Sequence, residues 1–96
     1  MIVSIRSFGS VDTEAFWRGA RVARFQSFER VAIRKLQMLH AAAALNALAA
    51  VPGNRLEKLQ GGRLGQHSLR INDQWRLCFR WVQLDAYDVE ITNHYA

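Results

Sequence analysis

The apolar residues of this chain change their spacing at one point, the turn Pro52-Gly53-Asn54. Before the turn they recur every three or four residues, as on one face of a helix, and after it they alternate with polar residues, as in a strand. Proline fixes φ and glycine tolerates a reversal, so the tripeptide itself is typical of a turn. The change of period predicts an α+β fold, in which a first strand and the helices precede a run of three or four antiparallel strands that have one face covered by helix.

Two helices are predicted before this turn. Asp12 or Thr13 can cap a short helix that runs through residue 18 and ends at Gly19. The stronger pattern follows Ser27, a second candidate N-cap, and spans residues 28–43. Its apolar face carries Phe28, Val31, Ala32, Leu36, Leu39 and Ala43, whereas Glu29, Arg30, Arg34, Lys35 and Gln37 fall mostly on the opposite side. Asn46 either breaks this helix or starts a last short one through residue 50.

Strand patterns lie at both ends of the chain. They cover residues 2–8, 67–71, 75–82 and 88–92, with a short extended piece at 56–59, a glycine loop at 61–65 and turns at 72–73 and 84–86. The clearest strand places Trp75, Leu77, Phe79 and Trp81 on one face and Arg76, Cys78 and Arg80 on the other. Because the first set is apolar, we expect it to pack beneath the helices.

Length and composition restrict the class of protein. The 96 residues allow one domain, residues 1–96, and half of them are apolar, so disorder is not the dominant character. The single cysteine, Cys78, cannot form an internal disulfide, which is typical of a reducing compartment. The chain starts without the basic and long apolar segments of an export signal, and its most apolar stretch, residues 41–51, is far shorter than the ~20 residues of a membrane span. We therefore expect a cytoplasmic protein with no membrane partner.

Positive charge is concentrated in arginine, which supplies 11 of the 13 basic residues. Residues 1–55 carry 8 positive and 3 negative groups, residues 56–82 carry 5 and 2, and residues 83–96 carry none and 3. GC-rich codon usage favours arginine, but guanidinium also binds phosphate through two parallel hydrogen bonds. A basic body with an acidic last segment fits an anionic polymer as partner.

Strand alternation brings arginines to one sheet face. If the aromatic residues pack beneath the helices, Arg76 and Arg80 project from the uncovered face, and Arg70 of the preceding strand can join them. Three converging guanidinium groups can bind a phosphate. The alternative is a solvated face on which these arginines pair with Asp88 and Glu90.

Two histidines lie near this face in the sequence. His67 opens the first hairpin strand, and His94 follows the last strand between Asn93 and Tyr95. Histidine exchanges protons near neutral pH, so beside an arginine-lined face it suits acid–base attack on a phosphodiester. A surface or packing role is the ordinary alternative, and we assign it to His40. No spacing of metal ligands and no phosphate-binding glycine loop occurs, so we expect neither a metal nor another cofactor.

One continuous segment resembles a known family. It reads Leu59-Gln60-Gly61-Gly62-Arg63-Leu64-Gly65-Gln66-His67-Ser68-Leu69-Arg70-Ile71-Asn72-Asp73-Gln74-Trp75-Arg76-Leu77-Cys78-Phe79-Arg80-Trp81. Its Leu-x-Gly-x-Arg-x-Gly loop and its Asn-x-x-Trp-Arg-hydrophobic-x-Phe strand resemble, in order and spacing, the HigB toxins of the RelE/ParE superfamily. The resemblance implies two main N-terminal helices packed on one face of a twisted, mainly antiparallel sheet of four to five strands.

The resemblance also implies a ribosome-dependent mRNA endonuclease. Such toxins enter the decoding site and cleave the message without metal, by assisting attack of a ribose 2′-OH on the adjacent phosphate. The implied partners are a helix-turn-helix antitoxin of the HigA type, the ribosome and mRNA, with operator DNA reached only through the antitoxin. A gyrase inhibitor like the ParE branch and a plain RNA-binding relative are the alternatives.

Site residues follow from the same resemblance. Arg76 matches the arginine that faces the scissile phosphate. Many relatives end in Asp-Tyr-His where this chain has Asn93-His94-Tyr95, and many carry a histidine at the position of Glu57. The resemblance therefore implies Asn93, His94, Tyr95 and Glu57 as catalytic candidates beside Arg76, and it leaves His94, Tyr95 and Glu57 open as the general base. Contacts to RNA are expected from Lys58, Arg63, His67, Arg70 and Arg80, with Arg63 holding the RNA backbone.

Overall fold

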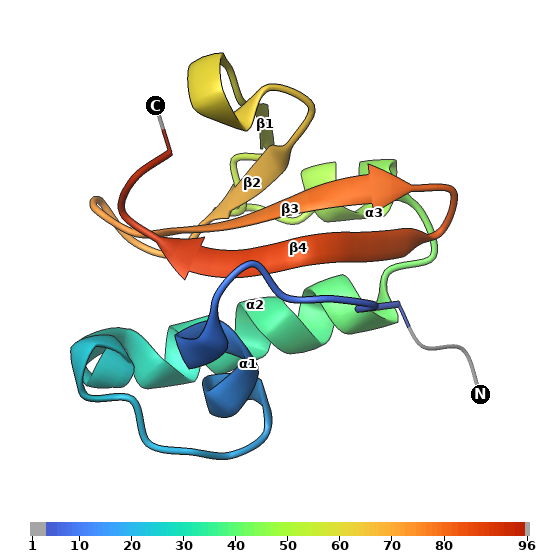
Figure 1. Cartoon of the computed structure of the whole chain (residues 1–96). Helices are drawn as coiled ribbons and strands as arrows, with labels where there is room; N and C mark the ends of the chain where they lie inside the picture. Colours follow the sequence, from blue (N-terminus) through green and yellow to red (C-terminus); the bar gives the residue numbers. More distant parts are fainter. Residues whose placement is uncertain (1–3, 96) are drawn as a thin grey trace.

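The computed structural model describes residues 4–95 and places helices against a four-stranded sheet (Figure 1). The helices are α1 (Val11–Trp17), the 3-10 helix η1 (Ala23–Phe28), α2 (Glu29–Ala41) and α3 (Leu45–Ala49). The strands are β1 (Glu57–Lys58), β2 (His67–Arg70), β3 (Arg76–Val82) and β4 (Asp85–Thr92), with the 3-10 helix η2 (Gly61–Arg63) between β1 and β2. The predicted α+β class is confirmed. Within the described residues, no helix is long and apolar enough to cross a membrane.

The four strands pair antiparallel in their sequence order. The strand predicted over residues 2–8 is wrong within the described part, and residues 2 and 3 lie outside it. Only Ile5 and Phe8 bridge to β4, each through one parallel bridge, to Ala86 and Val89. Pairing is interrupted between them, where Asp88 has a φ of 54° and β4 shifts its register against β3.

The apolar face of β3 is the centre of the core, as the alternation predicted. Leu77 and Phe79 are fully buried in one cluster with Leu36 and Leu39 of α2. Trp75 packs on η1, with its ring centroid 5.8 and 5.1 Å from those of the two η1 phenylalanines. Each fully buried apolar side chain of this size stabilises the fold by about 1.5–3 kcal/mol, so this face supplies much of the hydrophobic stability.

Both predicted helix caps are wrong. Ser10 caps α1, because its Oγ accepts a hydrogen bond from the Thr13 N–H at 3.1 Å, and Asp12 lies inside the first turn instead. At α2, η1 runs directly into the helix, so Phe28 occupies the N-cap position without a side-chain bond and Ser27 lies within η1. The turn of 3-10 helix thus replaces the cap that the sequence suggested.

Lys35 lies on the buried side of α2, not on the polar side where the sequence placed it. Its Nζ donates to Asn54 Oδ1, and the fully buried Asn54 amide donates to the Leu48 carbonyl at 2.9 Å. Burial lowers the pKa of Lys35, and Arg34 and Arg70 lower it further by repulsion. The bond between Lys35 and Asn54 thus connects α2 to the turn that precedes β1.

The last hairpin is tighter than predicted. Val82 pairs with Asp85, so Gln83 and Leu84 alone form the turn. Residues 85–86, which the sequence assigned to the turn, belong to β4. Gln83 has a φ of 57°, the left-handed conformation that two-residue hairpins require. A glutamine at this position gives little sign of such a turn, which explains the difference.

Candidate functional site

Arg76 lies on the sheet face opposite the helices, but it is not exposed as the sequence predicted. Alternation along β3 directs Arg76 and Cys78 away from the core, yet they are 6% and 0% exposed. The chain around η2 and the residues after β4 stand on this side of the sheet (Figure 1). Alternation predicts the side from which a residue projects. It does not predict that distant segments return over that side.

The Arg76 guanidinium is fixed by the chain on both sides of it. Its Nε donates to Ser68 Oγ at 2.6 Å, and its Nη2 donates to the Arg55 carbonyl and lies 3.4 Å from the Ser68 carbonyl. The third nitrogen, Nη1, faces Glu57 Oε1 at 3.7 Å and makes no hydrogen bond to residues 4–95. The side chain is therefore rigidly held and keeps one nitrogen available for a ligand.

Two of the predicted proton-transfer groups flank Arg76. Glu57 reaches it from the edge strand β1 and keeps 58% of its side chain exposed. Tyr95 reaches it from the C-terminal residues, with its ring centroid 5.9 Å from Arg76 Cζ. A fixed cation between an exposed carboxylate and a phenol can bind a phosphate and exchange protons with it.

The prediction that the other two arginines of this face converge on Arg76 is wrong. Arg70 pairs with Asp73 in the turn after β2. Arg80 donates to Asp88 Oδ2 at 3.2 Å and is 3.4 Å from the Leu64 carbonyl. The alternative of paired arginines is thus correct for Arg80 and Asp88, and each guanidinium has its own partners.

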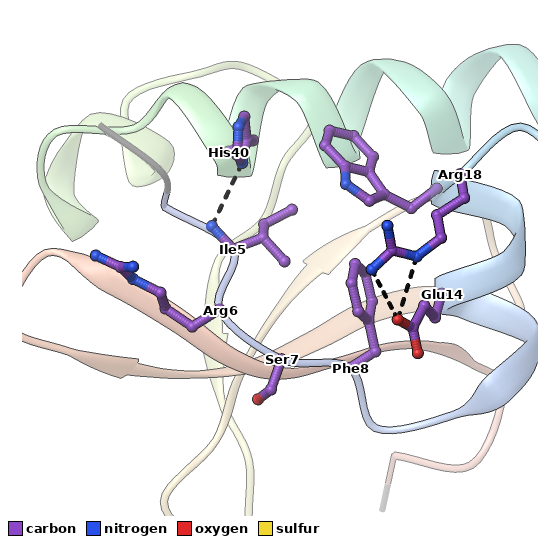
Figure 2. Close-up of a pocket in the computed structure, with 8 residues that line it drawn as sticks. Ile5, Arg6, Ser7, Phe8, Glu14, Arg18 and His40 are labelled. Atoms are coloured by element: carbon purple, nitrogen blue, oxygen red, sulfur yellow. Dashed lines mark hydrogen bonds and ion pairs between the residues drawn. The ribbon is translucent and has the colours of Figure 1, made fainter. Parts of the chain in front are cut away.

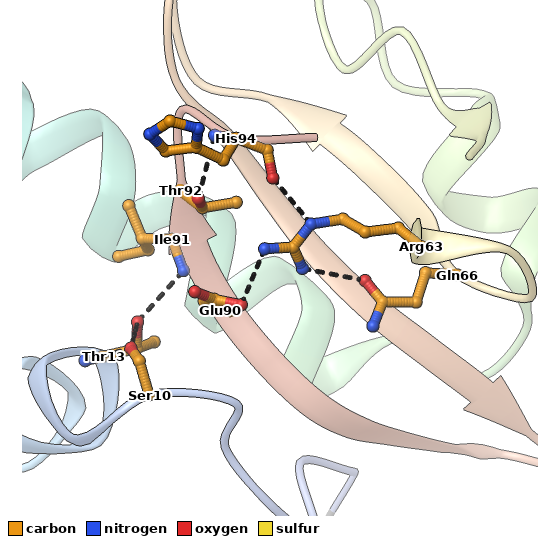
Figure 3. A network of polar contacts seen from close by, with 8 residues as sticks. All are labelled: Ser10, Thr13, Arg63, Gln66, Glu90, Ile91, Thr92 and His94. Atoms are coloured by element: carbon orange, nitrogen blue, oxygen red, sulfur yellow. Dashed lines mark hydrogen bonds and ion pairs between the residues drawn. The ribbon is translucent and has the colours of Figure 1, made fainter. Parts of the chain in front are cut away.

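Arg63 joins three separate segments (Figure 3). Its Nε donates to the His94 carbonyl at 2.7 Å, Nη1 to Gln66 Oε1 at 3.2 Å, and Nη2 to Glu90 Oε1 at 3.0 Å. The His94 N–H in turn donates to Thr92 Oγ1 at 3.0 Å. The backbone of His94 is therefore anchored on both sides, while its imidazole points away from the Arg63 guanidinium (Figure 3). Both His94 and the adjacent Asn93 are exposed.

His67 and Lys58 lie on the other side of the sheet from Arg76. They oppose each other across β1 and β2, and His67 is in register with Phe79 of the core face, with ring centroids 6.1 Å apart. Burial lowers the pKa of His67, and the Lys58 charge adds to this shift. The sequence placed His67 near the arginine face, but alternation along β2 directs it to the opposite one.

Cys78 lies beneath the charged cluster. The pKa of its thiol is raised to about 11, mainly by burial; Arg63 and Arg76 act to lower it, and Glu90 acts to raise it. The thiol is therefore protonated at neutral pH. It fills space under the site and has no nucleophilic role there.

Sequence reasoning missed the residues that hold the arginines. Ser68 and the Arg55 carbonyl hold Arg76, and the buried Gln66 and the Thr92 hydroxyl support the segments around Arg63. Ser68 alone had a usable signal, because it shares its strand face with Arg70. The others act through loop or backbone geometry that has no pattern in the sequence.

A cavity of about 540 Å³ lies elsewhere, between the N-terminal segment, α1 and α2 (Figure 2). His40 closes it: its Nδ1 accepts a hydrogen bond from the Ile5 N–H at 3.4 Å, and its ring lies 5.2 Å from that of Trp17. The packing role predicted for His40 is confirmed. Glu14 and Arg18 form an ion pair at the same cavity, 3.0 Å apart. Nowhere in residues 4–95 do three or more His, Cys, Asp or Glu side chains form a group that could hold a metal ion.

Residues 14–95 match the model of one family, described as the RelE-like toxin of the type II toxin–antitoxin system HigB. Toxin HigB-1 of Vibrio cholerae serotype O1 is 43% identical over 68 residues, which cover 71% of this chain and 72% of that toxin. The chain belongs to the HigB-like toxin family. The family match includes β1 to β4, η2 and the C-terminal residues, and the resemblance predicted from residues 59–81 is confirmed.

The HigB-like fold is shared with solved toxin structures. The YoeB–YefM complex from Staphylococcus aureus aligns with a TM-score of 0.63 at 22% identity, covering 97% of this chain and 98% of that one. The YoeB dimer from the same organism aligns with a TM-score of 0.57 at 19% identity, covering 99% and 100%. These alignments show that the chain shares its arrangement of helices and sheet with the two YoeB structures. The chain is thus a HigB/RelE-like toxin of a toxin–antitoxin system.

Proposed function

We propose that this toxin is a ribosome-dependent endoribonuclease that cleaves translated mRNA without a metal ion and so arrests growth. Membership of the HigB-like family supports the reaction class. The observation that carries the proposal is the Arg76 guanidinium, which is held by Ser68 and Arg55 and leaves Nη1 beside an exposed carboxylate. A cation fixed in advance stabilises developing negative charge without having to reorganise.

In the proposed reaction, the Glu57 carboxylate takes the proton of a ribose 2′-OH. The bond from this oxygen to the adjacent phosphorus forms, and the bond from phosphorus to the 5′ oxygen breaks. Arg76 stabilises the charge on the phosphoryl oxygens between these events. Tyr95, whose ring centroid lies 5.9 Å from Arg76 Cζ, is proposed to donate a proton to the departing 5′ oxygen. The products are a 2′,3′-cyclic phosphate and a 5′-hydroxyl end, and the need for a 2′-OH restricts the substrate to RNA.

Arg70 and Arg80 are proposed to bind the RNA backbone beside this centre. Their side chains are 34% and 42% exposed, and each now pairs with an exposed carboxylate. Such surface pairs contribute only about 0–1 kcal/mol, so a phosphate can replace the carboxylate at little cost. Lys58 and His67 lie across the sheet edge from Glu57 and are proposed to contact RNA that crosses that edge.

The proposed partners are a helix-turn-helix antitoxin of the HigA type, the ribosomal decoding site and the message. Operator DNA is reached only through the antitoxin. The solved YoeB–YefM complex, a toxin of this fold bound to YefM, supports an antitoxin partner for this chain. We expect that the adjacent reading frame encodes this partner and that its coexpression relieves toxicity.

The function is tested by inducing the protein in bacteria and mapping message ends by primer extension. We expect new ends inside translated messages, and none in the same message after its start codon is removed. Accumulation of cleaved gyrase–DNA complexes without message cleavage would assign the protein to gyrase inhibition instead. If the bacteria tolerate expression and the protein binds RNA in a salt-sensitive way without cleaving it, the protein is a plain RNA-binding protein.

A further inference from the structure

All three nitrogens of the Arg63 guanidinium already have partners within the protein. They contact the His94 carbonyl, the Gln66 amide oxygen and the Glu90 carboxylate at 2.7, 3.2 and 3.0 Å (Figure 3). The Arg63 and Glu90 side chains are only 19% and 24% exposed. An arginine that binds RNA from such a position must first break contacts with three segments, which distinguishes Arg63 from the more exposed Arg70 and Arg80.

The contact to His94 controls the part of the chain that carries Tyr95. Strand β4 ends at Thr92, so the following residues are outside the sheet ladder. His94 is held through its N–H by the Thr92 hydroxyl and through its carbonyl by Arg63. Tyr95 is the next residue, and its ring lies 5.9 Å from Arg76 Cζ. Without the Arg63 contact, the Thr92 hydroxyl is the one hydrogen-bond partner that residues 4–95 leave to the backbone of His94 and Tyr95.

We infer that Arg63 is a positioning residue that fixes the C-terminal residues 93–95 over Arg76, and that it is not a ligand of the RNA backbone. The role in cleavage rests on the proposed nuclease function, whereas the anchoring of residues 93–95 does not. A displacement of about 1 Å in a reacting group lowers the rate by about 100-fold, so a residue that holds such a group affects turnover more than binding. This role replaces the contact to RNA backbone that the sequence suggested for Arg63.

The test compares Arg63→Ala and Arg63→Lys by amide hydrogen exchange and by cleavage kinetics on ribosomes. In Arg63→Ala we expect the His94 amide, whose N–H donates to Thr92 Oγ1, to exchange about tenfold faster or more, because loss of the charged hydrogen bond to the His94 carbonyl lets this segment open. The amides of β3 should keep their rates. We expect kcat to fall by about 100-fold with KM within about twofold of wild type. Arg63→Lys keeps the charge but loses the planar fork, so it should resemble Arg63→Ala.

Arg80→Ala is the matched control. It removes the same charge from the same side of the sheet, but Arg80 contacts Asp88 and Leu64 and not residues 93–95. We expect the exchange of the His94 amide to be unchanged in this variant. Glu90→Gln is a milder second variant, because it keeps an acceptor oxygen for Arg63 but removes the charge. It should raise the exchange rate of the His94 amide by a smaller factor, and it replaces Arg63→Ala if that variant does not fold.

Several results would overturn the inference. Unchanged exchange at the His94 amide in the Arg63 variants excludes the anchoring role, whatever the cleavage data show. A raised KM with unchanged kcat, restored by Arg63→Lys, assigns Arg63 to RNA binding. If the wild-type protein cleaves no message, the nuclease proposal fails while the exchange result still decides whether Arg63 anchors residues 93–95.

Discussion

At the first half of β3 the two faces of the sheet are both buried, but by different means. On the helix side, Leu77 and Phe79 pack against apolar residues of α2. On the opposite side, Arg76 and Cys78 are buried by polar chain: the Ser68 hydroxyl, the Arg55 carbonyl and the Arg63–Glu90 pair. Burial of apolar surface is favourable wherever it occurs, whereas a buried charge is tolerated only in a fixed arrangement of partners. The helix face therefore stabilises the fold, and the opposite face holds the residues of the candidate site in fixed positions.

The largest expected effect tests the stabilising face. Phe79→Ala should lower the free energy of unfolding by about 4 kcal/mol, because a fully buried ring leaves a cavity. Its neighbour on the other face, Cys78, is equally buried, but Cys78→Ala should cost only about 1 kcal/mol, since it removes one small group. Urea unfolding followed by tryptophan fluorescence measures both. If the two variants lowered the free energy of unfolding equally, the claim that the helix face supplies most of the stability would be contradicted.

Glu57 tests the positioning face. Glu57→Gln should lower kcat for message cleavage by about 100-fold, because it removes the proposed general base. The side chain is 58% exposed, so stability should change by less than about 1 kcal/mol. Glu14→Gln, the same change in an exposed ion pair on α1, is the control and should leave kcat unchanged. Unaltered kcat in Glu57→Gln would assign the base to Tyr95 or His94.

The smallest expected effect concerns pH. Because burial raises the pKa of Cys78 to about 11 from the usual 9.0, the folded protein holds this proton more tightly than the unfolded chain. Its contribution to stability is thus complete below pH 9.0 and is lost as the pH rises through about 11. Near about pH 10.5, wild type should have lost about 2 kcal/mol more than Cys78→Ala. Parallel pH profiles of the two proteins would show that Cys78 is not buried as described.

Sequence patterns predicted the helix face better than the other face, for a physical reason. Leu77, Phe79 and Trp75 are recognisable because apolar burial leaves a period in the sequence. The exposure of Arg76 was predicted wrongly, because its cover comes from residues far away in the chain. Lys35 was misplaced for a similar reason: its partner Asn54 lies 19 residues away, and no local pattern connects them.

The residues of the site were partly predictable. Arg76, Glu57 and Tyr95 were named from motif positions, and the structure brings these three side chains together. His67 was named too, but strand alternation directs it to the other face. The supports of Arg76 were not found, because a backbone carbonyl such as that of Arg55 has the same chemistry at every residue.

The central claim is that the face opposite the helices holds a cleavage site organised by Arg76. Its most direct test is the rate of message cleavage on purified ribosomes that carry a defined codon in the decoding site, measured for wild type and Arg76→Ala. Urea unfolding of the variant provides the fold control, with an expected loss of about 2 kcal/mol. We expect wild type to leave 2′,3′-cyclic phosphate ends and the folded Arg76→Ala protein to cleave about 1000-fold more slowly. Cleavage by Arg76→Ala at the wild-type rate would contradict the account.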